Sequence, residues 1–318
     1  MKKVQVLLAI LGMALLTVGF SALGAPLKIA IILPSSINDG EWSQGLYQDL
    51  LALVDEYGED NLEVAYSENM WNIADADVAA RDYAAEGYAL IIGHGGQFGN
   101  ILIEAARDFP GTSFAIGTDG TPFMAYGLAN FFGYDASADE VGYVVGGLAA
   151  RLSESGTVGL INPIQSGDVA GYEAGFTAGA KAANPNIEVL SVWTGSYSDS
   201  ALASEAAQTM VAAGADILTG TSQAVVAAMG VARDNGALWF GMRINQSYLA
   251  PATVALSSVY DWKVCIRPMI ESIRAGVLGG ELYDLNLANG GLYVEVHEAA
   301  LFGKTIQGII DGSINSYP

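Results

Sequence analysis

The stretch LKIAIIL, residues 27–33, is an apolar run that stops at Pro34. A run of this length without polar alternation predicts a strand buried on both faces, which is typical of parallel sheets. The same signal returns along the first half of the chain, separated by segments of helical periodicity. The strands expected there are 62–66, 88–93 and 113–117, and the expected helices are 42–57, 75–86 and 98–108. Strands that alternate with helices indicate βαβ units.

A second series of the same kind begins near Ser155. Its expected strands are 157–161, 187–193, 215–220 and 237–241, and its expected helices are 169–183, 200–213 and 223–235. The first strand of each series leads into a proline and, five residues later, an aspartate, which are Pro34 with Asp39 and Pro163 with Asp168. We therefore predict an α/β fold with two Rossmann-like lobes, each built on a parallel sheet.

Two segments are expected to join the lobes, residues 125–140 and the region near 253–258. Neither is rich in proline and glycine like a flexible linker, so we interpret both as hinge strands. The expected N-terminal lobe comprises residues 25–130 and about 257–285, and the expected C-terminal lobe comprises 131–256 and about 286–318. In the last part of the chain we expect a loop and hairpin over 277–294 and an amphipathic helix over 297–312.

Residues 1–24 have the pattern of a secretory signal peptide. Lys2 and Lys3 precede an apolar run from Val6 to Phe20, and the small residues SALGA follow it, so a cut ahead of Ala25 is expected. An uncut membrane anchor is the alternative, but the run is shorter than the roughly 20 apolar residues that a membrane span needs. No cysteine is available there to carry a lipid anchor. We therefore expect a soluble protein that is periplasmic or secreted.

The composition narrows the classes of partner. The formal net charge is −21 at pH 7, and an acidic chain repels phosphate backbones, so we expect no nucleic-acid partner. Cys265 is the single cysteine. An exported chain of this composition relies on packing and not on disulfides, and we expect the Cys265 side chain to be a buried small hydrophobe.

Ligands of open α/β sheets bind beyond the carboxyl ends of the strands. This rule selects the loops 34–42, 93–100, 118–120, 162–168, 194–199, 220–223 and 242–246. Aromatic and hydrogen-bonding residues recur in these loops, and they are Asp39, Trp42, Phe98, Asp119, Tyr197 and Arg243.

Most of these residues also have a purely structural interpretation. Asp39 fits a helix N-cap, and we assign Asp168 and Asp199 to caps as well. Asp119 fits a turn. The rings of Trp42, Phe98 and Tyr197 fit a core, which is the commoner place for a large aromatic side chain.

Catalytic and cofactor motifs are not found in the sequence. The GHGGQFG loop fails the dinucleotide pattern because position 98 is Phe, and there is no Walker phosphate loop. There is no G-x-S-x-G elbow, and His94 lacks an adjacent Cys, Asp or Glu for a metal site. We therefore expect no enzyme, no cofactor and no metal. Rings with a few acids and amides suit a flat polar ligand, which stacks on the rings and donates hydrogen bonds to the carboxylates.

Long ordered stretches of the chain resemble one family. They are NDGEWSQGLYQDL (38–50), AAEGYALIIGHGGQFGNILIEAARDFP (84–110), YEAGFTAGAKAANPNIEVLSVWTGSYSD (172–199) and GMRINQSYLAP (241–251). These stretches resemble the basic membrane protein (BMP) family of periplasmic ligand-binding proteins, of the purine nucleoside receptor type that serves ABC importers. The resemblance implies a type I periplasmic binding protein fold, a small-molecule ligand and an ABC permease partner.

The family's ligand-binding positions fall on several residues of this chain. The resemblance implies that Asn38 and Asp39 contact the polar edge of a base and that Trp42 and Tyr197 replace stacking aromatics. Asp119 would be a further polar contact. The remaining candidates for the ligand site are Phe98, which matches a family phenylalanine, Lys263, which falls near a family lysine, and His94 and Trp262.

The sequence departs from the family at the sugar-facing positions. Arg243 stands where the nucleoside binders have an aspartate that holds the ribose hydroxyls, and a guanidinium has only donors. Ser43, Gly96 and Asn100 also replace family residues. The segment SVYDW (258–262) resembles a branch that includes a free-base binder. We therefore expect a purine or purine-like heterocycle, with a free base or an anionic or carbonyl-rich heterocycle favoured over a simple nucleoside.

The resemblance implies capture by closure of the two lobes around the ligand. Three alternatives stay open: a protein that binds a sugar or a furanone signal, a ligand-sensing partner of a membrane receptor, and an exported enzyme that cleaves nucleosides. Stacking aromatics with acids serve sugars too, and the lack of an activated nucleophile argues against the enzyme.

Overall fold

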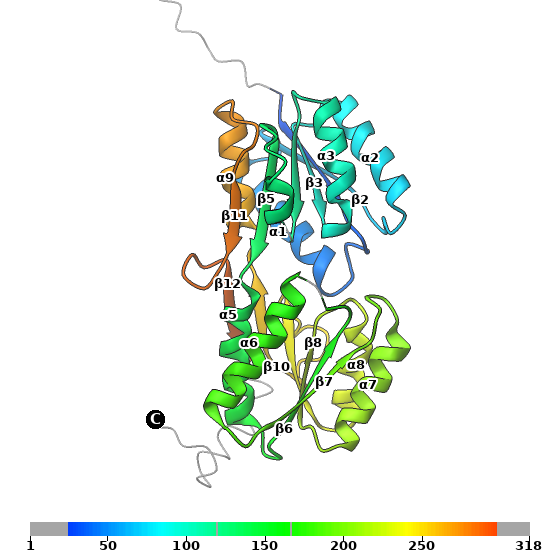
Figure 1. The fold of residues 1–318 in the computed structure, drawn as a ribbon, viewed down its shortest axis with the longest axis vertical. Helices are drawn as coiled ribbons and strands as arrows, with labels where there is room; N and C mark the ends of the chain where they lie inside the picture. Colours follow the sequence, from blue (N-terminus) through cyan, green and yellow to red (C-terminus); the bar gives the residue numbers. More distant parts are fainter. Residues whose placement is uncertain (1–24, 119, 166, 298–318) are drawn as a thin grey trace, which may run out of the picture.

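The computed structural model describes residues 25–118, 120–165 and 167–297. The chain forms two lobes, one above the other, each with a sheet between helices (Figure 1). The strands are β1 Leu27–Ile32, β2 Leu62–Ser67, β3 Leu90–His94, β4 Ser113–Gly117, β5 Phe131–Ala136, β6 Thr157–Asn162, β7 Glu188–Trp193, β8 Ile217–Gly220, β9 Leu238–Arg243, β10 Val254–Tyr260, β11 Leu282–Leu285 and β12 Leu292–Val296. The helices are α1 Trp42–Tyr57, α2 Ile73–Ala85, η1 Gly96–Phe98, α3 Gly99–Asp108, α4 Gly120–Met124, α5 Ala138–Leu152, α6 Gly167–Ala183, α7 Ser200–Ala212, α8 Val225–Asp234 and α9 Lys263–Arg274.

The two sheets have the same strand order and differ in the direction of the last strand. The first sheet runs β11-β5-β4-β3-β1-β2, and all its strand pairs are parallel. The second runs β12-β10-β9-β8-β6-β7, and only β12 pairs antiparallel with its neighbour. The predicted α/β fold with two parallel-sheet lobes is confirmed.

The opening stretch is buried as its apolar pattern predicts. Residues 29–33 have no solvent exposure, and β1 lies between β2 and β3 in the sheet. One apolar cluster packs α1 and α9 against this sheet and continues to α5 and α6 in the second lobe. Separate clusters lie under α2 and α3 and under α7 and α8. Both faces of each sheet are therefore covered by helices, as parallel sheets require.

The chain crosses between the lobes after β5, after β10 and between β11 and β12. The strand β5 therefore belongs to the first sheet and β10 to the second, whereas the expected lobe boundaries placed residues 131–136 in the second lobe and 257–260 in the first. The expected hairpin over 277–294 is wrong, because β11 pairs with β5 and β12 pairs with β10. The two strands are neighbours in the sequence but belong to different sheets, so they do not pair with each other.

Glycines allow α5 and α6 to approach each other closely. A Cβ atom added at Gly146 would lie 2.0 Å from the carbonyl oxygen of Phe176, and one added at Gly179 would lie 1.9 Å from that of Tyr143. The helix backbones therefore touch where no side chain could fit.

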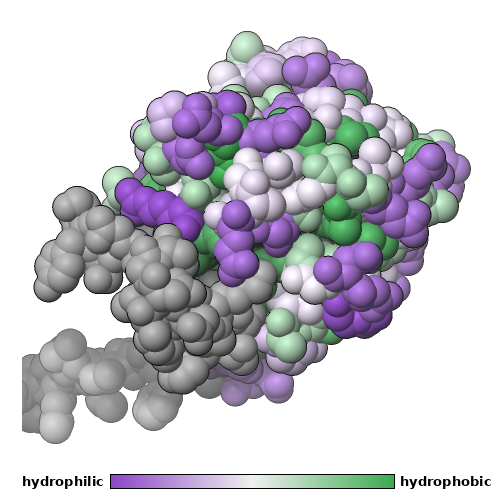
Figure 2. All heavy atoms as spheres, turned by 90° about the horizontal axis from the view of Figure 1, so that it is seen from below, coloured by the Kyte–Doolittle hydropathy of each residue, from purple (hydrophilic) through white to green (hydrophobic). Residues whose placement is uncertain are grey.

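The expected signal peptide over 1–24 and the final helix over 297–312 lie outside the described residues, apart from residue 297. Among the helices of residues 25–118, 120–165 and 167–297, none is long and apolar enough to cross a membrane. Seen from the end of the second lobe, the surface mixes hydrophilic and hydrophobic residues (Figure 2). Cys265 is a free, buried thiol.

Candidate functional site

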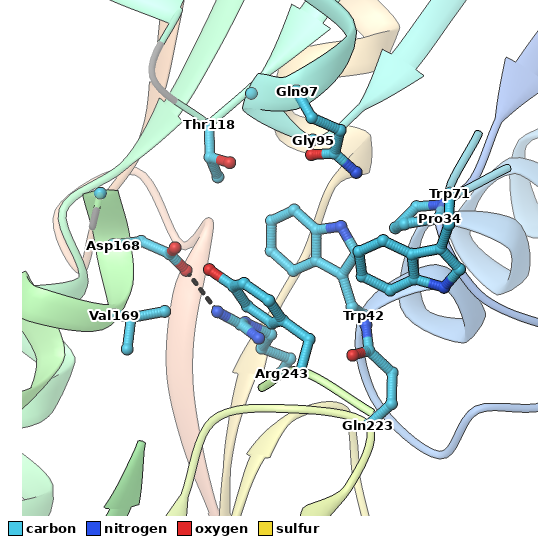
Figure 3. Close-up of a pocket in the computed structure, with 13 residues that line it drawn as sticks. Pro34, Trp42, Trp71, Gly95, Gln97, Thr118, Asp168, Val169, Gln223 and Arg243 are labelled. Carbon is cyan, nitrogen blue, oxygen red and sulfur yellow. Dashed lines mark hydrogen bonds and ion pairs between the residues drawn. The ribbon is translucent and has the colours of Figure 1, made fainter. Parts of the chain in front are cut away.

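The carboxyl ends of both sheets face each other across a cleft between the lobes. The cleft holds a cavity of about 180 Å³. Its lining comes from every loop selected by the strand-end rule, from Trp71 after β2, and from Val169 in α6. The lining residues are Pro34, Trp42, Trp71, Gly95, Gly96, Gln97, Thr118, Gly167, Asp168, Val169, Tyr197, Gln223 and Arg243 (Figure 3).

Trp42 forms part of the cavity wall but is held firmly by its surroundings. Its indole Nε1 donates a hydrogen bond to the backbone oxygen of His94 at 2.9 Å, and the two rings stack with centroids 4.1 Å apart. The ring of Trp262 meets it edge-on at 5.2 Å. Only 6% of Trp42 is exposed. Trp42 is therefore both a core ring and a cavity-lining ring.

His94 stacks on Trp42, is fully buried and does not line the cavity. Its Nδ1 lies 2.7 Å from the Tyr134 hydroxyl, and its Nε2 lies 3.3 Å from the backbone oxygen of Trp42. Burial lowers the pKa of His94 to about 3, although the bond to Trp42 opposes that shift. The imidazole is therefore neutral at physiological pH.

Arg243 crosses the cleft from the end of β9. Its Nη1 donates to Oε1 of Glu41 at 2.6 Å, and its Nη2 donates to Oδ2 of Asp168 at 2.7 Å. The guanidinium also lies 4.4 Å from the ring centroid of Trp42. Glu41 comes from the first lobe and Asp168 from the second. We refer to Glu41, Arg243 and Asp168 as the buried triad.

The buried triad has unusual protonation properties. Burial raises the pKa of Glu41 to about 7, against the lowering effect of Arg243, and Asp39 and Asp168 raise it further. Burial acts to lower the pKa of Arg243, but Asp168 and Glu41 more than offset this and raise it above its usual value. Arg243 is therefore always charged, and both of its terminal nitrogens are used within the protein.

Two rings from opposite lobes stand at the mouth of the cavity. Trp71 is 46% exposed, and its ring centroid lies 6.3 Å from that of Tyr197 with the planes tilted by 35°. Trp71 follows β2 in the first lobe, and Tyr197 follows β7 in the second. A flat molecule in the cavity has an aromatic face from each lobe within reach.

Polar atoms in the cavity wall complement the rings. The Oε1 atom of Gln223 is buried and has no hydrogen-bond partner among the described residues. The side-chain amide of Gln97 is directed toward Trp42 and Trp71 from the first lobe (Figure 3). Asp168 uses Oδ2 for Arg243 and stands at the wall with the rest of its carboxylate. The wall therefore offers both acceptors and donors.

Backbone strain is concentrated at this cleft. Of the described non-glycine residues, Asn69, Thr118 and Arg243 have positive φ angles, of 60°, 51° and 67°. Thr118 and Arg243 line the cavity, and Asn69 lies two residues before Trp71. Such conformations cost about 1–3 kcal/mol each and are typical of ligand sites.

The residues predicted for the ligand site are not all in the cavity wall. Trp42, Tyr197 and Arg243 line it. Asp119 lies outside the described residues. His94, Phe98, Trp262, Lys263, Asn38 and Asp39 do not line it.

Asp39 acts as a cap at the start of α1. Its Oδ1 accepts from the backbone nitrogens of Glu41 and Gln44 at 2.9 and 3.1 Å. Its Oδ2 accepts from the backbone nitrogen of Ser43 at 2.9 Å and from the hydroxyl of Ser35 at 2.6 Å. Both oxygens are therefore engaged by the protein, and the neighbouring Asn38 is exposed.

Three other predicted residues lie behind or beside the cavity. Phe98 is fully buried in the cluster under α2 and α3. Trp262 is fully buried against Trp42 and His94. The Nζ atom of Lys263 pairs with Oδ1 of Asp49 at 2.9 Å and with Oδ1 of Asp261 at 2.8 Å.

Sequence reasoning missed several lining residues, and it misassigned Asp168. Asp199 caps α7 as expected, since it accepts from the backbone nitrogens of Ala201 and Leu202. Asp168 instead binds Arg243, because a buried guanidinium needs a carboxylate partner. Trp71 could have been found by applying the strand-end rule to the loop after β2. Gln97 and Gln223 lay within the selected loops but were not singled out.

Within the described ranges, no group of three or more His, Cys, Asp or Glu side chains is arranged to hold a metal ion. The rings, amides and buried charges of the cavity are suited to holding a small polar molecule without one.

Comparisons with known proteins agree with this geometry. A family model described as ABC transporter substrate-binding protein PnrA-like matches residues 27–313. A solved solute-binding protein of an ABC transporter system from Conexibacter woesei aligns with a TM-score of 0.73 and 23% identity, over 91% of this chain and 98% of that chain.

Three relatives whose names state a function are similar along most of the chain. A purine-binding protein of Brucella abortus is 30% identical, over 74% of this chain and 65% of that protein. The nucleoside-binding protein BmpA of an ABC transporter in Lactococcus lactis subsp. cremoris is 24% identical, over 91% and 88%. The transcriptional activator protein Med of Bacillus subtilis is 28% identical, over 81% and 79%.

Proposed function

Because the chain belongs to the PnrA-like family of ABC transporter substrate-binding proteins, we propose that its cleft captures a purine or purine-like heterocycle, with a free base favoured over a nucleoside. Substrate-binding proteins of ABC importers work outside the cytoplasm and deliver a small molecule to a membrane permease. Substrate binding for an ABC transporter is thus the function of the family, and the identity of the ligand is our proposal.

The observation that carries the proposal is the pairing of Trp71 and Tyr197 across the cleft. A purine has two flat faces and an edge of ring nitrogens and exocyclic groups. Stacking on an aromatic ring suits its faces, while Gln97 and Gln223 supply a donor and an acceptor for its edge. The purine-binding relative in Brucella abortus and the nucleoside-binding relative in Lactococcus lactis support the same ligand class.

Two features favour a free base. The cavity of about 180 Å³ is smaller than the roughly 300–1,000 Å³ of pockets for drug-sized ligands. Arg243 cannot accept hydrogen bonds from sugar hydroxyls, and its terminal nitrogens are already bound to Glu41 and Asp168.

The buried triad also supports a mechanism of capture by lobe closure. Glu41 and Arg243 come from different lobes, and they are in contact while neither is exposed to more than a few per cent. Opening the lobes would separate them and admit water to the cavity, and closing would enclose the ligand.

The test is to identify the molecule that the purified protein carries. The chain would be purified without added ligand, denatured, and the released small molecules analysed by mass spectrometry. We expect a purine or a close heterocyclic analogue in up to equimolar amount. A released sugar, with no displacement by any purine, would refute the proposed ligand class.

A second role, ligand sensing, is favoured by the similarity to the transcriptional activator Med. It requires the same ligand-bound cleft but a different partner. Deleting the chain from its host separates the roles: loss of purine uptake indicates transport, whereas intact uptake with altered gene expression indicates sensing.

A further inference from the structure

Glu41 is a buried acid that does not line the cavity. It is fully buried, and its Oε1 accepts from Arg243 while its Oε2 has no hydrogen-bond partner among the described residues. Arg243 and Asp168, in contrast, both line the cavity. A buried ion pair of this kind is costly to form and contributes more to geometry than to net stability.

We propose that Glu41 is a positioning residue for ligand capture: from the first lobe it holds Arg243, which in turn holds the Asp168 carboxylate at the cavity wall in the closed cleft. This inference deepens the proposed function and rests on it for the identity of the ligand. The effect of Glu41 on the movement of the lobes can be tested without knowing the ligand.

The geometry of the guanidinium supports this role. A planar fork with fixed donors binds two carboxylates at defined angles, so fixing one end of Arg243 fixes the other. The two bonds are 2.6 and 2.7 Å long, and the side chains of Arg243, Glu41 and Asp168 are only 4%, 0% and 9% exposed. The left-handed backbone of Arg243, with φ of 67°, further restricts its position.

The contacts of Glu41 with Arg243 and of Arg243 with Asp168 can form together only when the lobes are closed, because Glu41 lies in the first lobe and the other two residues lie in the second. Two neutral contacts reinforce the closed arrangement nearby. The Gln246 side chain donates to the backbone oxygen of Gly40 at 2.9 Å, and the Gln44 side chain donates to the Tyr248 hydroxyl at 3.0 Å. These bonds join the lobes, and neither reaches the cavity wall.

A positioning role for Glu41 gives the affinity a definite pH dependence. The charged and titratable groups that act on it are Arg243, Asp39 and Asp168, and Glu41 in turn acts on the buried Tyr260. Burial raises the pKa of Glu41 to about 7 in the closed cleft, from the ordinary glutamate value of 4.5 that we expect when opening exposes it. A group whose pKa is higher in the closed cleft than in the open one stabilises the closed form fully at a pH below its open-cleft pKa. That stabilisation is lost as the pH rises to its closed-cleft pKa. The affinity should therefore fall by up to about tenfold per pH unit between pH 4.5 and 7 and be flat above.

The experiment compares Glu41→Gln with Glu41→Ala, using adenine and hypoxanthine as probes in calorimetry from pH 5 to 8. We expect Glu41→Gln to keep a hydrogen bond to Arg243, to lose the pH dependence, and to bind at least as tightly as the parent protein at pH 8. We expect Glu41→Ala to bind at least about tenfold more weakly, since it leaves a buried guanidinium nitrogen unpaired. Glu63→Gln, on the exposed side of the first lobe, is the matched control and should change nothing.

Lobe closure is measured separately, so that the inference can fail independently of the ligand assignment. Spin labels at Val78→Cys on α2 and Leu202→Cys on α7 use exposed positions in different lobes, and the native Cys265 is buried. With no probe added, Glu41→Ala should shift the label distances toward a longer population, and Glu41→Gln should not. Identical distances in all three proteins would overturn the positioning role, whether or not a purine binds. Equal probe affinities and equal pH profiles in the three proteins would overturn it as well.

Discussion

Replacing Trp71 with alanine should weaken ligand binding while leaving the fold intact. Trp71 is 46% exposed and is not one of the buried core residues. Its ring faces that of Tyr197 across the mouth of the cavity. Stacking of a base on an aromatic side chain is worth about 1–3 kcal/mol. The affinity for adenine or hypoxanthine should therefore fall by about 5- to 150-fold. The free energy of unfolding should change by about 0.5 kcal/mol or less.

Calorimetry gives the affinity, and urea unfolding gives the stability. Two controls isolate the role of the ring. Tyr143→Ala removes a ring on α5 that is similarly exposed, at 50%, and does not line the cavity, so binding should be unchanged. Trp42→Ala removes a buried ring and should cost about 3–5 kcal/mol of stability. If Trp71→Ala binds purines as tightly as the parent protein, the assignment of Trp71 and Tyr197 as the stacking pair is wrong.

The remaining predictions concern stability. Gly146→Ala should destabilise the protein by about 1–3 kcal/mol, because the new Cβ would lie 2.0 Å from the Phe176 carbonyl oxygen. Gly147→Ala is the control and should not destabilise it, since the nearest atom to its new Cβ is 3.7 Å away. Thermal unfolding of the two variants tests this difference. Burial lowers the pKa of His94 to about 3, so the stability that neutral His94 provides is present above pH 6.5 and is lost as pH falls. Between pH 6.5 and 4.5 the parent protein should lose up to about 3 kcal/mol relative to His94→Gln in urea unfolding, and equal losses would contradict the account.

The architecture could be predicted because its signals are local. The run at residues 27–33 is apolar on both faces, and its strand is buried in the sheet as expected. The helix expected at 42–57 has those bounds in the structure. Repetition of the same local pattern after Ser155 predicted the second lobe. The hairpin expected over 277–294 was wrong because β12 pairs with β10 and β11 pairs with β5, and such pairings between separate segments leave no local pattern.

The cavity could be predicted by loop but not by side chain. Strand-end geometry selected the loops correctly, whereas the complete burial of Phe98 and Trp262 depends on packing that no local pattern encodes. The partners of Arg243 show the difficulty most clearly. Glu41 and Asp168 lie 202 and 75 residues from Arg243 in the sequence. The sequence therefore identified Arg243 as a cation in a ligand loop but not the two carboxylates that bind it.

The central claim is that the cleft binds a purine-like heterocycle and prefers the free base. The most direct measurement is calorimetry on protein that has been unfolded, freed of carried ligand and refolded, titrated in turn with adenine, hypoxanthine, their nucleosides and a set of pentoses and hexoses. We expect one site per chain that binds a free base most tightly, the matching nucleoside more weakly, and the sugars not at all. Binding of a sugar without binding of any base would contradict it.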